Sequence, residues 1–77
     1  MAIDFESLLT NDQKIELVNN RISQFAAEAY QVSLNKKTAE SIGTEENISA
    51  LENTLKVLES AITVHQEELD RLNKLTN

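Results

Sequence analysis

The chain has 77 residues, a net charge of −6 and no cysteine. This length is enough for one domain, and the lack of cysteine excludes disulfides, thiolate metal sites and a thiol nucleophile. Seven basic residues spread along the chain do not form the clustered basic surface that nucleic-acid binding requires.

Residues 1–10 form a short mixed segment ahead of the first long helix. Phe5, Leu8 and Leu9 would share one face of a helical turn, and Asp4 would cap it. We expect an N-terminal arm or short helix that covers one end of the molecule. The alternative is a docking peptide for a partner.

Helix-ending signals divide the rest of the chain into two long helices. Thr10 and Gln13 have the spacing of a capping box and predict a first helix over residues 11–42. Gly43, the only glycine, suits a left-handed C-terminal cap, and Thr44 is expected to cap a second helix over residues 45–75. Because residues 43–44 make a tight turn, the sequence predicts an all-α fold, an antiparallel two-helix hairpin that resembles a coiled coil.

Apolar residues recur at alternating steps of three and four in both predicted helices, which is a heptad pattern. Antiparallel partners have residue numbers that add to 87, as Phe25 and Ile62 do. His65 stands where leucine is expected, and it either specifies the register or acts as a pH switch. The predicted hairpin seam consists of Ile15, Val18, Ile22, Phe25, Ala29, Val32, Ile48, Leu51, Leu55, Leu58, Ile62, His65, Leu69 and Leu72.

Both predicted helices also carry apolar residues outside the seam. A stripe wider than a coiled-coil seam is typical of a helix that contacts more than one neighbour. We therefore expect a bundle, completed by self-association into a dimer or larger oligomer, or by docking on a larger protein. Tyr30 is expected to contribute most to such binding. The candidate partner face consists of Ala27, Tyr30, Leu34, Val57, Ala61 and Val64.

The sequence offers no catalytic, cofactor-binding or metal-binding constellation. Catalysis needs a nucleophile, a base and a means of excluding water, and a two-helix hairpin encloses almost no interior. The acidic cluster Glu67, Glu68 and Asp70 lacks the spacing and central glycine of a calcium loop, and the single histidine cannot build a zinc site. We predict a protein that is not an enzyme and has no cofactor or small-molecule substrate.

The chain has no run of 18 apolar residues and no basic N-terminal cluster, so it predicts neither a membrane-spanning helix nor a secretory signal. The expected location is intracellular, without membrane or nucleic-acid partners. The segments RISQFAAEAYQ, residues 21–31, and VHQEEL, residues 64–69, resemble small uncharacterised helical proteins of marine tailed phages. This resemblance implies a virion component or a phage-encoded accessory protein, in the virion or the host cytoplasm, and it implies no site residues.

The leading functional hypothesis is a structural or interaction protein that self-associates or docks on a larger protein through apolar helix faces. The acidic composition leaves open a regulator or inhibitor that occupies a basic surface of a host protein. A small assembly chaperone or adaptor is the third possibility.

Overall fold

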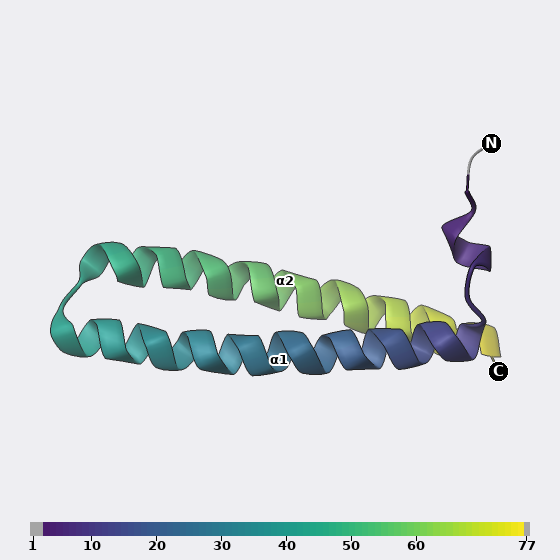
Figure 1. Cartoon of the computed structure of the whole chain (residues 1–77), viewed down its shortest axis with the longest axis horizontal. Helices are drawn as coiled ribbons and strands as arrows, with labels where there is room; N and C mark the ends of the chain where they lie inside the picture. Colours follow the sequence, from purple (N-terminus) through teal and green to yellow (C-terminus); the bar gives the residue numbers. More distant parts are fainter. Residues whose placement is uncertain (1–2, 77) are drawn as a thin grey trace.

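The computed structural model describes residues 3–76 as two long helices folded back on each other (Figure 1). A short 3-10 helix, η1 (Phe5–Ser7), precedes two α-helices of 32 residues each, α1 (Asn11–Ile42) and α2 (Glu45–Thr76). The described residues contain no strand, and the predicted all-α hairpin is confirmed. The first two residues of the predicted arm lie outside the described residues.

The N-terminus of α1 is closed by a pair of reciprocal hydrogen bonds. The backbone N–H of Gln13 donates to Thr10 Oγ1 at 3.1 Å, and the backbone N–H of Thr10 donates to Gln13 Oε1 at 2.9 Å. Thr10 has an extended backbone, with φ −70° and ψ 163°. These bonds satisfy donors that would otherwise lack an intrahelical partner, so the helix begins where the capping box predicts.

The turn between the helices depends on one glycine and one carbonyl group. Gly43 adopts φ 74° and ψ 28°, a left-handed conformation that costs a residue with a side chain about 1–2 kcal/mol. The carbonyl oxygen of Ala39 accepts from the N–H groups of Gly43 and of Thr44, the latter at 3.2 Å. The Thr44 hydroxyl also donates to this oxygen at 3.5 Å. The hydroxyl thus bonds the end of α1, where we expected it to cap α2.

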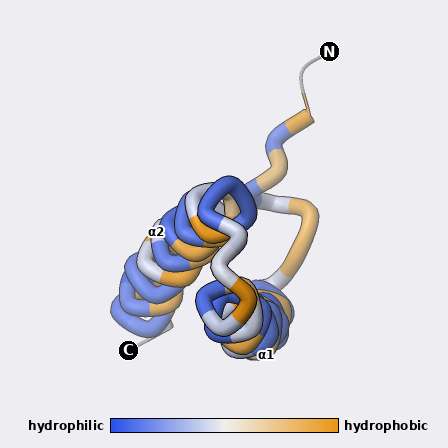
Figure 2. Tube along the Cα trace, turned by 90° about the vertical axis from the view of Figure 1, so that its left-hand side faces the viewer, coloured by the Kyte–Doolittle hydropathy of each residue, from blue (hydrophilic) through white to orange (hydrophobic). Residues whose placement is uncertain are grey.

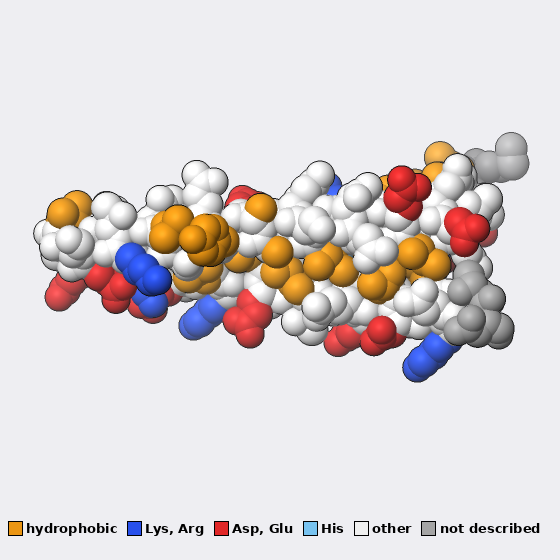
Figure 3. Space-filling view, turned by 90° about the horizontal axis from the view of Figure 1, so that it is seen from below, with side chains coloured by type: hydrophobic (Ala, Val, Ile, Leu, Met, Phe, Trp, Pro, Cys, Tyr) orange, Lys and Arg blue, Asp and Glu red, His pale blue; other side chains and the backbone are white. Residues whose placement is uncertain are grey.

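The apolar stripe between the helices is covered only in part. Val18, Leu58 and Leu72 are buried, Leu72 completely, and Ala39 joins them near the turn. The other eleven residues of the predicted seam are partly buried. Figure 3 shows hydrophobic side chains as a row between the helices over most of the length of the molecule. Two helices cannot enclose the apolar seam between them, because the seam stays open to solvent along both of its edges.

An arm of residues 3–10, which includes η1, projects from the open end of the hairpin, opposite the turn. Figures 1 and 2 show its backbone leaving that end at a steep angle to both long helices. Asp4 caps η1 by accepting from the backbone N–H of Glu6 at 3.1 Å. Within residues 3–76, neither long helix has a stretch apolar enough to span a membrane.

Candidate functional site

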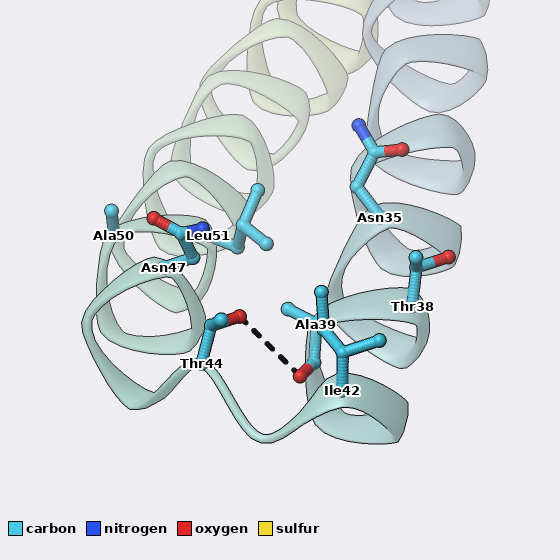
Figure 4. A pocket seen from close by; sticks show the side chains of 8 residues that line it. All are labelled: Asn35, Thr38, Ala39, Ile42, Thr44, Asn47, Ala50 and Leu51. Carbon is cyan, nitrogen blue, oxygen red and sulfur yellow. Dashed lines mark hydrogen bonds between the residues drawn. The ribbon is translucent and has the colours of Figure 1, made fainter.

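One broad side of the hairpin is hollowed near both ends. The hollow near the turn is lined from both helices, as Figure 4 shows. A second hollow lies near the open end. In each helix a residue of one hollow lies five full turns from a residue of the other, Leu17 from Asn35 in α1 and Ala50 from Glu68 in α2. The two hollows therefore lie on the same side of the hairpin. We call this side the hollowed face. Its turn-end hollow is lined by Asn35, Thr38, Ala39, Ile42, Thr44, Asn47, Ala50 and Leu51, and its open-end hollow by Leu17, Val18, Val64, His65, Glu67, Glu68 and Arg71.

The hollowed face combines exposed apolar side chains with few charges. Ile42 is 69% exposed and Val64 is 60% exposed, although both are aliphatic. Helical spacing and the lining of the open-end hollow place three basic residues on this face, Lys14, Arg21 and Arg71, and three acidic ones, Glu28, Glu67 and Glu68. The other exposed apolar side chains that helical spacing places there are Leu17, Ala50, Val57 and Leu75.

The opposite side of the seam is acidic, and we call it the charged face. There Lys36 Nζ lies 3.7 Å from Glu52 Oε1 and links α1 to α2. Figure 3, which views the molecule from the side opposite the arm, shows charged side chains along the edges of the apolar row. Helical spacing assigns to this face the basic residues Lys36, Lys37 and Lys56 and the acidic residues Asp12, Glu16, Glu40, Glu45, Glu52, Glu59 and Asp70.

The six residues of the candidate partner face do not lie together. Val57 and Val64 are exposed on the hollowed face, beside the partly buried Ala61. Tyr30, which is 68% exposed, is turned by about 140° from Leu17 around the axis of α1. Ala27 and Leu34, two other exposed residues of the candidate partner face, lie near Tyr30 on the outward side of α1, which is turned away from α2. The structure therefore separates the set into two surfaces.

Ion pairs join the arm to both helices at the open end. Lys14 Nζ donates to Glu6 Oε2 at 3.0 Å, and Arg71 Nη2 lies 3.3 Å from the same carboxylate. Arg71 also donates from Nε and Nη2 to the two oxygens of Glu68, both at 2.7 Å. Sequence reasoning missed this network, because Glu6 and Arg71 are 65 positions apart and no local pattern connects them.

The network changes the pKa of Glu6, Glu68 and Arg71. The hydrogen bond from Lys14, together with the charge of Arg71, lowers the pKa of Glu6 below its ordinary value. The hydrogen bond from Arg71 lowers the pKa of Glu68, and the bond to Glu68 in turn raises the pKa of Arg71. Each of these three shifts favours the charged form, which strengthens the ion pairs between the arm and the helices.

His65 packs inside the seam against an aromatic ring. The rings of His65 and Phe25 meet edge to face, with centroids 4.9 Å apart. His65 Nδ1 lies 2.7 Å from the carbonyl oxygen of Ala61, a distance at which this nitrogen donates the proton. The guanidinium carbon of Arg21 lies 5.2 Å from the centroid of the Phe25 ring. The imidazole therefore has a satisfied polar atom and an apolar contact in the seam.

The described residues contain no group of three or more histidine, cysteine or acidic side chains placed to hold a metal ion. Comparisons of the chain with models of protein families, with curated proteins and with solved structures find no match. The resemblance to phage proteins therefore stays a prediction from the sequence.

Proposed function

We propose that the protein is a non-enzymatic structural or interaction protein, a helical hairpin that self-associates through an apolar helix face. The observation that carries this proposal is the incomplete core. Among the described residues only Val18, Ala39, Leu58 and Leu72 are buried apolar side chains. A small core rarely supplies more than about 3–5 kcal/mol, so domains of this size usually need a disulfide, a metal or association.

The surface area supports the same proposal. The chain exposes 5973 Å². A compact monomer of 8.6 kDa would expose about 4,700 Å², which is about 1,300 Å² less. The excess comes from an elongated shape, 50 × 30 × 14 Å, in which most seam residues remain partly exposed. Packing another pair of helices against the hairpin removes such surface from water and stabilises the seam.

The proposal is tested by the mass of the protein in solution. Light scattering over a hundredfold range of concentration is combined with circular dichroism on the same samples. We expect a helical dimer or larger oligomer whose dissociation on dilution lowers the melting temperature. A stable, fully helical monomer at every concentration would contradict self-association, because the hairpin would then need no partner.

The charged face favours a second candidate function, an acidic regulator that occupies a basic surface of another protein. Seven acidic and three basic residues on one face produce a negative field over that side. Salt separates the two candidates, since a complex made through this face weakens steeply between low and high ionic strength. Association through apolar side chains does not weaken in this way.

A further inference from the structure

We propose that the hollowed face binds the hollowed face of a second copy of the chain, with the two hairpins antiparallel to each other. In this arrangement the arm of each copy lies against the turn end of its partner. The inference rests on the proposed self-association and specifies its face and orientation. The assembly is a four-helix bundle with a two-fold axis through the middle of the interface.

Charge decides between the two faces. Two charged faces brought together would set seven acidic residues of each copy against those of the other, and like charges across an interface oppose association. The hollowed face instead holds equal numbers of basic and acidic residues, three of each, among exposed aliphatic side chains. Two copies that meet through this face keep most of their negative charge on the outside of the dimer, where it remains hydrated.

The exposed area of the hairpin as a whole is large enough to supply a dimer interface. A compact dimer of twice the mass would expose about 2,000 Å² less per chain than the single hairpin does. The total of about 4,000 Å² falls within the range of about 2,000–5,000 Å² that obligate homodimers bury.

The arm determines the orientation. Residues of the arm, Phe5, Glu6 and Leu9, line a further hollow with Lys14, Leu17, Val18 and Glu68, so the arm stands at the open end of the hollowed face (Figures 1 and 2). Two hairpins aligned turn to turn would bring both arms to the same place. Antiparallel hairpins instead place each arm beside the turn-end hollow of the partner. There Phe5, which is 75% exposed in one chain, faces the exposed Ile42.

A matched pair of substitutions tests the face. Val64→Asp lies on the hollowed face and Tyr30→Asp on the outward side of α1, and both residues are exposed in the single chain. We expect Val64→Asp to raise the dimer Kd at least about 100-fold, because the dimer would bury two unpaired carboxylates. Tyr30→Asp should change the Kd by no more than about threefold. Circular dichroism on both variants checks that each remains helical.

The outcomes separate this inference from the proposed function. Dissociation by Tyr30→Asp with an unchanged Kd for Val64→Asp would overturn the hollowed face as the interface, while self-association itself would stand. A wild-type protein that stays monomeric would instead overturn the proposed function.

The orientation is tested by a distance between two copies of one label. The chain has no cysteine, so a spin label on Ser41→Cys, an exposed residue near the turn that does not line the hollows, marks a single position. Antiparallel hairpins place the two labels about 45 Å apart, given the rise of the helix. Hairpins aligned turn to turn place them within about 30 Å, and that result would overturn the orientation.

Discussion

The two ends of the hairpin are held together by different forces. At the turn, the carbonyl oxygen of Ala39 accepts hydrogen bonds from residues four and five positions along the chain. At the open end, the carboxylate of Glu6 bridges Lys14 and Arg71, which belong to different helices. The turn therefore depends on local backbone conformation, whereas the open end depends on charges that solvent and salt can screen.

The largest effect is expected from the seam that both ends share. Leu58→Asp places a carboxylate where 6% of the side chain is exposed, and an unpaired buried charge destabilises by more than about 4 kcal/mol. That exceeds what a core of this size supplies, so we expect the loss of most helicity by circular dichroism. Ser60→Asp, an exposed position two residues on, is the control and should stay helical. If the Leu58→Asp variant stayed helical, the turn and the open-end ion pairs would be sufficient to hold α1 and α2 together without an intact seam.

A smaller effect is expected at the turn. Gly43→Ala forces a left-handed conformation on a residue with a side chain, at about 1 kcal/mol, although an added Cβ would meet no atom within 4 Å. Thermal unfolding at constant protein concentration should show a melting temperature lower by about 4–8 °C. Gly43→Asn should lower it less, since asparagine tolerates this conformation better. Equal losses for both variants would mean that backbone strain does not explain the effect.

The smallest effect is expected at the open end and depends on pH. The pKa of Glu6 is lower in the folded chain than its ordinary value of 4.5. A carboxylate with a lowered pKa stabilises the docked arm above that ordinary value and ceases to do so as the pH falls through the folded pKa. We expect the amide NMR signals of Glu6 and Ser7 to move toward those of an unstructured chain in acid, with the turn unaffected.

The same signals test the role of Arg71. Arg71→Gln removes the charge that links Glu6 to α2, so the pKa of Glu6 should rise toward 4.5 and the arm should loosen already at neutral pH. Lys74→Gln, a change of another basic residue three positions on, is the control and should leave the arm docked. An arm that stays in place in acid and in Arg71→Gln would mean that ion pairs do not hold it.

The parts of the fold that the sequence predicts are those set by neighbours along the chain. The capping box joins Thr10 to Gln13, and the left-handed cap at Gly43 serves a carbonyl group four residues earlier. Thr44 stands at the expected position ahead of α2, where its carbonyl oxygen accepts from the N–H of Ile48, but its hydroxyl bonds the end of α1. A threonine between two helices can bond either helix end, and only the path of the turn selects Ala39.

The candidate surface was less accessible to sequence reasoning. The hollowed face includes Leu17 and Ile42, which lie 25 positions apart in α1 with polar residues at the intervening positions of that side, so no stripe reveals them. Tyr30 was predicted to contribute most to binding because it is a tyrosine, yet it lies on a different side of α1 from Leu17 and Ile42. Assignment to a face needs the direction of the neighbouring helix as well as the helical period.

The sequence by itself determined that the chain forms two antiparallel helices, because hydrogen bonds, caps and the heptad pattern act over three to seven residues. Only the tertiary structure decided that Glu6 meets Arg71, that His65 packs on Phe25, and that apolar residues of both helices share one face. These contacts join residues far apart in the chain, so they depend on the register of the seam and on the side on which each helix faces solvent.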